Sequence, residues 1–167
     1  MRQLTVDDVS NNPGLFTEFL LQTEKQELDI GNEFKFTGQY LEALIKALEH
    51  PNCKLTSLDF DNLRSDRVIK QTGAKALAKA LEHPNCKLTS VQLFNNDICD
   101  EGVKALAEAL LHPNCKLTSL YVDGNNISQD GAKALAKALE HPNCKLTIVQ
   151  LFNNDICDEG VKALAEA

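Results

Sequence analysis

The sequence predicts an α/β solenoid, in which strand–helix units stack into a curved parallel β-sheet on a concave face with α-helices on the convex face. The heptapeptide HPNCKLT recurs at residues 50–56, 83–89, 112–118 and 141–147, with starts 33, 29 and 29 residues apart. After each copy, a short alternating apolar run precedes an amphipathic helical pattern. Such a period is typical of stacked-repeat proteins, whose units bury their apolar sides only against neighbours.

Composition and charge are those of a soluble folded protein and exclude several functions. The chain of 167 residues is 43% apolar and 25% charged, with a net charge of -7. Residues 1–50 hold nine acidic and four basic side chains. Because no basic stripe and no apolar run of about 18 residues is present, we expect neither nucleic-acid nor membrane binding. The acidic surplus favours a partner with a basic face.

Residues 1–27 lie outside the repeat pattern, and we interpret them as an N-terminal helical cap. Asn11-Asn12-Pro13 is typical of a helix start, and the apolar residues that follow recur at helical spacing. A solenoid needs such a cap because its first unit would otherwise expose an apolar side. A separate binding role for this helix is the alternative. The segment also lacks the apolar core of a signal peptide, so we expect a cytoplasmic protein.

Residues 28–167 hold the repeats. A degenerate first unit spans about 28–52, with a strand at 28–30 and a helical face formed by Leu41, Leu44, Ile45 and Leu48. The next unit starts near 53 and carries four extra residues within 61–72, which predict a longer loop. That loop is rich in charge, and we favour a solvated loop over a binding site. Its charged residues are Arg64, Asp66, Arg67 and Lys70.

Units starting near 86, 115 and 144 are regular, and the last is incomplete. Residues 91–109 and 149–167 are identical over nineteen positions at a separation of 58 residues, so the array has a period of two units. The last unit stops within its helical pattern. We expect either that the chain is a fragment of a longer array or that another molecule covers its open end.

Within the regular units the apolar residues follow the pattern LxxLxLxxNxI, as in Leu88, Val91, Leu93 and Ile98, whereas the unit starting near 53 has Leu63 in place of the asparagine. The asparagine of this pattern, Asn96, is expected to satisfy backbone groups in a turn. Asn125 and Asn154 occupy the same position. Asp100 or Ser128 then predicts a helix cap, and each helix must end before Pro113 or Pro142.

These motifs resemble the ribonuclease-inhibitor-like class of leucine-rich repeat, which also occurs in NOD-like receptors and in eukaryote-like bacterial effectors. The resemblance covers residues 28–167 and implies a leucine-rich repeat solenoid. It implies a protein-binding role in innate sensing, enzyme inhibition or delivery into a host cell, without choosing among them. As a secreted effector, the protein would act in the host cytoplasm.

The histidines and cysteines carry no expected chemistry of their own. All four histidines lie in H-x-x-C pairs that recur with the repeat. We interpret them as helix ends and strand entrances, because a row of such pairs is not the closed tetrahedron that zinc prefers. We therefore predict no metal, no cofactor and six free thiols. No catalytic motif is present, so we expect no enzymatic activity.

The outward strand positions are the candidate binding residues. They are Asp59, Asp61, Gln92, Phe94, Tyr121, Asp123, Gln150 and Phe152. We expect the three aromatic residues to form a diagonal row on the concave face, flanked by aspartates, as in protein-binding hot spots. Packing of each Phe against its neighbour in the sheet is the alternative. A second hypothesis is self-association, with a homodimer formed through the last strand near residues 149–151.

Overall fold

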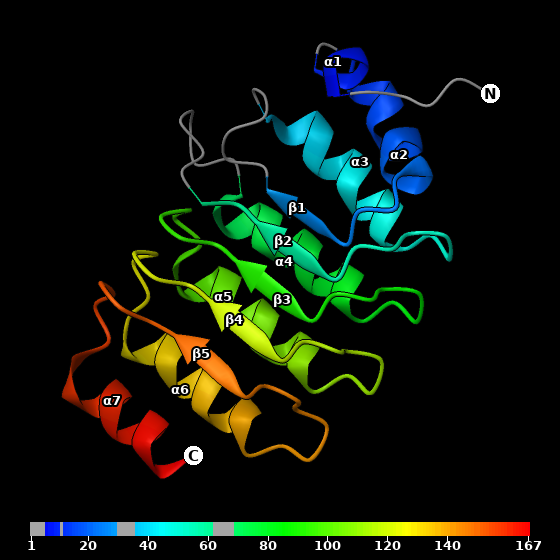
Figure 1. Cartoon of the computed structure of the whole chain (residues 1–167). Coiled ribbons are helices and arrows are strands. Elements are labelled where there is room, and N and C mark those ends of the chain that lie inside the picture. Colours follow the sequence, from blue (N-terminus) through cyan, green and yellow to red (C-terminus); the bar gives the residue numbers. More distant parts are fainter. Residues whose placement is uncertain (1–5, 11, 30–35, 62–68) are drawn as a thin grey trace.

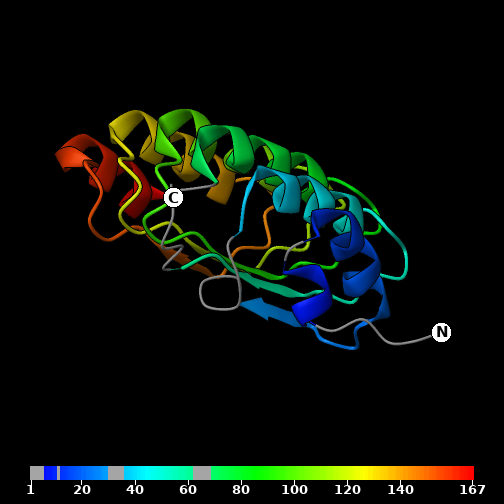
Figure 2. The ribbon, with the colours of Figure 1, turned by 90° about the horizontal axis from the view of Figure 1, so that it is seen from above.

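The structure is a computed structural model that describes residues 6–10, 12–29, 36–61 and 69–167. Over these residues the chain forms a curved solenoid with a sheet on one side and helices on the other (Figure 1, Figure 2). The predicted fold class, an α/β solenoid with a curved parallel sheet on one face and α-helices on the other, is confirmed.

The sheet is parallel, and its strands follow chain order. In the described part of the chain it has five strands, β1 to β5, each three residues long. They are β1 (Glu27–Asp29), β2 (Ser57–Asp59), β3 (Ser90–Gln92), β4 (Ser119–Tyr121) and β5 (Ile148–Gln150). The register is continuous, so the middle residues form one line across the sheet. Four of these, Leu28, Leu58, Val91 and Leu120, are buried, and Val149 at the open edge is partly buried.

Helices cover the side of the sheet to which these middle residues point (Figure 2). They are α3 (Gly38–Leu48), α4 (Lys70–Leu81), α5 (Cys99–Leu110), α6 (Gln129–Leu139) and α7 (Cys157–Glu166). The buried positions of α4, α5 and α6 are leucine, alanine and one glycine each, with Val103 in addition in α5, so neighbouring helices approach closely. As predicted, α5 and α6 end before Pro113 and Pro142.

The N-terminal helices α1 (Val6–Val9) and α2 (Pro13–Gln22) pack at the β1 end of the array (Figure 1). The side chain of Asn12 accepts a hydrogen bond from the Gly14 N–H at 3.1 Å and so caps α2. The Tyr40 hydroxyl donates to the carbonyl oxygens of Val9 at 2.7 Å and Ser10 at 2.9 Å. These bonds tie α3 of the first unit to the segment before α2.

An aromatic cluster joins this segment to the first two units. The Phe16 ring meets Tyr40 edge to face, with ring centroids 5.3 Å apart. Phe36 in turn lies 5.9 Å from both Tyr40 and Phe60, between centroids. All four residues are buried, so the start of the array has an aromatic core where later units have leucine and valine.

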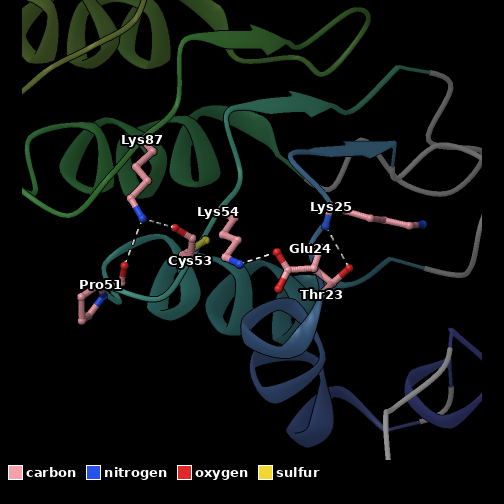
Figure 3. A network of polar contacts seen from close by, with 7 residues as sticks. All are labelled: Thr23, Glu24, Lys25, Pro51, Cys53, Lys54 and Lys87. Carbon is pink, nitrogen blue, oxygen red and sulfur yellow. Dashed lines mark hydrogen bonds and ion pairs between the residues drawn. The ribbon is translucent and has the colours of Figure 1, made fainter.

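The HPNCKLT segment holds each unit to the one before it (Figure 3). The ammonium group of Lys87 donates to the carbonyl oxygens of Pro51 at 3.0 Å and Cys53 at 2.8 Å. The Asn85 amide donates to the Glu49 carbonyl, just past the end of α3, at 3.0 Å. Lysines and asparagines of the next two copies repeat these contacts. The segment therefore links neighbouring units besides ending a helix and starting a strand.

A buried asparagine ladder forms the second link between units. The Asn125 Oδ1 atom accepts from the N–H groups of Asn96 at 3.0 Å and Ile98 at 3.2 Å, and its Nδ2 donates to the Leu93 carbonyl at 2.7 Å. Asn154 repeats this pattern one unit later. The structural role expected of these asparagines is confirmed. The Oδ1 atom of Asn96 has no partner among the described residues.

The prediction that Asp100 caps the helix in which it lies is wrong. Ser128 caps its own helix, α6, by accepting from the Asp130 N–H at 3.2 Å. Asp100 lies inside the first turn of α5 and instead contacts the start of α6 in the following unit.

The predicted charged loop lies largely outside the described residues. These exclude Arg64, Asp66 and Arg67, whereas Lys70 is described and begins α4.

Candidate protein-binding surface

The concave face carries the first and third residue of each strand, because the middle residue points to the helices. The register sets these side chains in rows. The first row is Glu27, Ser57, Ser90, Ser119 and Ile148, and the second is Asp29, Asp59, Gln92, Tyr121 and Gln150. Two residues further along come Asp61, Phe94, Asp123 and Phe152. All eight candidate binding residues therefore lie on or next to this face.

The β1 and β2 end of the face is acidic. Glu27 and Asp29 are exposed, and Asp59 and Asp61 are partly exposed. Burial raises the pKa of the Asp61 carboxyl, and the carboxylates of Asp59, Asp123 and Asp29 raise it further, against the lowering effect of a hydrogen bond from the Phe94 N–H. These carboxylates are thus close enough to repel one another, which favours a cationic partner.

The β4 and β5 end is apolar and aromatic. Phe152 is 70% exposed and Ile148 is 45% exposed, and Tyr121 and Phe94 are partly exposed. Ile148 is the first residue of β5, and Phe152 lies two residues beyond the end of that strand. Sequence reasoning missed Ile148, although the change from serine in the three preceding copies to isoleucine was a readable signal.

The aromatic residues do not form the diagonal row that was expected. Tyr121 pairs in register with Gln92 on one side and Gln150 on the other. Phe94 and Phe152 lie one pleat further along, two strands apart, with Asp123 at the intervening position. The three residues therefore lie on neighbouring chain segments at two levels, with Tyr121 one pleat before Phe94 and Phe152. Whether they bind a partner stays a prediction.

Two of the aspartates also have a structural role. The Oδ1 atom of Asp61 accepts from the Phe94 N–H at 3.0 Å, and Asp123 accepts in the same way from the Phe152 N–H at 2.6 Å. Asp123 is buried at 8% exposure. Each carboxylate thus fixes the backbone of the phenylalanine in the next unit, so the charge and the aromatic ring are positioned together.

The repeated histidines take part in turns. In each copy the histidine Nδ1 atom accepts from the backbone N–H of the asparagine two residues later, at 3.1 to 3.3 Å. That nitrogen is therefore occupied. Within the described ranges, no group of three or more His, Cys, Asp or Glu side chains is placed to hold a metal ion.

All six cysteines are free. Cys53, Cys86 and Cys115 are buried at successive strand entrances, whereas Cys157 is exposed. Burial raises the pKa of the Cys86 thiol to about 11. A thiol in this state is a poor nucleophile at neutral pH, so these residues act as small apolar side chains. Among the described helices, none has the length and apolar character needed to cross a bilayer.

The family match falls on three of the repeat units. Residues 85–107, 114–136 and 143–165 each match the leucine-rich repeat family. No curated protein gives a significant match. Among 55 matching chains of solved structures is Leiomodin-1 Actin-Binding Site 2, which is 22% identical. The match covers 97% of this chain and 89% of that one, with a TM-score of 0.65. At this identity the likeness shows the fold alone.

Proposed function

Because this chain is built of leucine-rich repeats, we propose that it is a non-catalytic protein-interaction scaffold that grips a partner with its concave face. The observation that carries the proposal is the division of this face into two ends. Four carboxylates gather at β1 and β2, and four apolar or aromatic side chains lie at or just beyond β3, β4 and β5. Aromatic anchors beside charges supply affinity and orientation in protein interfaces.

The partner that fits is a protein with a basic segment next to exposed apolar side chains. The basic segment would lie over Asp29, Asp59 and Asp61, and the apolar side chains would meet Tyr121 and Ile148. The 29-residue spacing, with a full α-helix in each described unit, supports the ribonuclease-inhibitor-like class. Six free thiols fit a reducing compartment, and we place the protein in the cytoplasm.

The test changes the aromatic end and leaves the core untouched. Phe94→Ala with Tyr121→Ala should weaken capture of the physiological partner at least tenfold, since each anchor of this kind contributes about 1–2 kcal/mol. Lys104→Ala with Glu108→Ala on the convex helix α5 is the matched control. Circular dichroism should show equal helix content in both variants. Equal capture by both would rule out the concave face.

The charge of the partner is tested by measuring how binding depends on salt concentration. Binding should weaken as the salt concentration rises, because salt screens the charges of the acidic end.

Filamentous actin is a first probe, since a structural neighbour is named for actin binding. Co-sedimentation that the double alanine variant reduces would identify actin as the partner. Co-sedimentation that the variant leaves unchanged would assign actin binding to another face.

Self-association through β5 is the second candidate function. It is favoured by the exposed Ile148 and by the unpaired outer edge of this strand. Light scattering at tens of micromolar separates the two. A monomer excludes edge-to-edge pairing, and a dimer that Ile148→Asp dissociates supports it.

A further inference from the structure

A groove on the convex side lies between α3 and α4, which are neighbours in the row of helices (Figure 2). Its volume is about 500 Å³, which is within the range of sites that bind ligands. The floor is closed where the two helices meet, because a side chain at Gly73 would come within 2.9 Å of the Leu41 side chain. Most of the residues that line the groove are apolar or small, namely Gly38, Leu41, Ile45, Thr72, Gly73 and Ala76.

The apolar lining originates in two positions of the degenerate first unit. Leu41 and Ile45 of α3 stand where α4 has Ala74 and Ala78. Larger side chains at a contact between helices increase the distance between the helix axes. Ile45 consequently remains partly exposed in the groove, although it also packs against the core.

The next groove along the convex side has a different chemistry. It lies between α4 and α5 and has almost the same volume, about 480 Å³. Six of the eight residues that line it are charged, namely Lys75, Lys79, Glu82, Glu101, Lys104 and Glu108. Such a surface is well solvated. An apolar groove is therefore not a property of every pair of neighbouring helices in this array.

Two charged side chains line the α3/α4 groove, and both belong to α3. Glu42 and Lys46 are exposed and lie four residues apart, which is about 6 Å along the helix. The residues that the structure places along the α4 wall are uncharged. An occupant of the groove therefore meets a carboxylate nearer the N-terminal end of α3 and an ammonium group one turn later.

An α-helix fits this groove better than an extended peptide does. Both walls are the sides of helices, whose backbone groups bond within their own helix, so they offer no row of partners to an extended backbone. A helix satisfies its own backbone and fills the groove with apolar side chains at i, i+3 and i+4. Because α3 and α4 follow parallel strands and run in the same direction, helix dipoles favour an occupant that runs the opposite way.

We propose that the α3/α4 groove docks an amphipathic helix of a partner protein, which runs antiparallel to α3 and places leucine-like side chains in the groove. In this orientation a glutamate of the partner faces Lys46, and a lysine four residues later faces Glu42. The same order stabilises the partner helix itself. The groove and the concave face lie on opposite sides of the sheet, so the scaffold can hold two partners at once.

Two synthetic peptides test the charge order. Each is helix-forming, fluorescein-labelled and about 15 residues long, with leucines at i, i+3, i+4 and i+7. In the first peptide a glutamate precedes a lysine by four residues beside the leucines, and in the second the two are exchanged. In fluorescence anisotropy at low salt, the first should bind about threefold to tenfold more tightly, as expected for two exposed charge pairs. The double change Glu42→Lys with Lys46→Glu should reverse this preference, which separates contact from the helicity of the peptides.

The location of the peptide is tested by placing a carboxylate in the groove. Ala76→Glu should weaken binding of the first peptide about tenfold or more, because the added charge loses water when the peptide binds. Ala105→Glu is the matched control, since Ala105 is the equivalent residue of α5, lines the charged groove and is likewise partly buried. It should change binding less than about twofold, as for an ordinary surface position. Circular dichroism should show equal helix content in both variants.

Three results would overturn the proposal. These are absence of binding by either peptide, equal effects of the two Ala→Glu changes, and an unreversed preference in the Glu42 and Lys46 double variant. Loss of peptide binding in Phe94→Ala with Tyr121→Ala would assign the peptide to the concave face and would also overturn it.

Discussion

Replacement of Asp100 by alanine tests how far one carboxylate holds two repeat units together. The change removes three hydrogen bonds, from the Ser128 hydroxyl and from the N–H groups of Ser128 and Gly131. Loss of a helix cap costs about 1 kcal/mol. A hydrogen bond to a charged group adds about 1.5 kcal/mol. Because Asp100 is only partly buried and water replaces some of these bonds, we expect a loss of about 2 kcal/mol.

The same loss should depend on pH. Burial would raise the pKa of Asp100, but the hydrogen bonds from Ser128 and Gly131 and the charge of Lys104 together lower it below the ordinary value of 3.8. A carboxyl whose pKa is lowered by folding stabilises the folded state above its unfolded pKa, and this contribution disappears as the pH falls through the folded value. The difference between wild type and Asp100→Ala should therefore be full at pH 7 and shrink below about pH 4.

Urea unfolding followed by circular dichroism measures the difference, and Asp158→Ala is the control. Asp158 lies in the same nineteen-residue sequence but has no following helix start to cap in the described array. Its replacement should cost less than about 0.5 kcal/mol, as for an ordinary surface position. If the two variants lose equal stability, Asp100 does not act through the next unit and the reasoning fails.

Three further predictions follow from other contacts. Asn125→Ala should cost about 3–5 kcal/mol in urea unfolding, because it leaves buried donors and acceptors unpaired, and a loss under about 1 kcal/mol would contradict the ladder. Asp61→Asn keeps an acceptor for the Phe94 N–H and removes a carboxyl whose pKa folding raises, so it should stabilise the chain at pH 7. That gain should vanish as the pH falls below about 3.8, and a gain independent of pH would count against it. In timed alkylation read by mass spectrometry, the exposed Cys157 should react first, and the buried Cys86 should react only when the protein unfolds. Early modification of Cys86 would contradict this prediction and would show that the strand entrance opens in the folded protein.

Much of the fold was predictable because it is periodic. A strand at Val91 and a helix ending before Pro113 follow from local spacing that recurs in every unit. The partner of Asp100 was not predictable in this way, because an aspartate at a helix start ordinarily caps its own helix. The cluster of Phe36 and Phe60 also escaped prediction. Its contacts join Phe16, which precedes the repeats, to Phe36 of the degenerate first unit and Phe60 of the next, and nothing in local spacing indicates which rings meet.

The outward strand positions could be predicted from the sequence, and their arrangement across the sheet could not. Strand alternation places Gln92 and Tyr121 outward, so the residues themselves could be identified. Their arrangement depends on register between strands, which puts Asp123 between the two phenylalanines. The structural use of Asp123 as an acceptor for the next backbone also depends on that register.

The hydrogen bonds that the Asp100 carboxylate accepts from Ser128 and Gly131 of the following unit restrict how an array of this kind can change in length. Insertion of a single unit would place two units of one kind side by side. Asp100 would then face a cysteine in place of Ser128, or a serine would face a unit without the aspartate. Insertion of a pair keeps every carboxylate matched to its hydroxyl. The smallest neutral step of growth or loss is therefore 58 residues, which is the separation of the two identical segments.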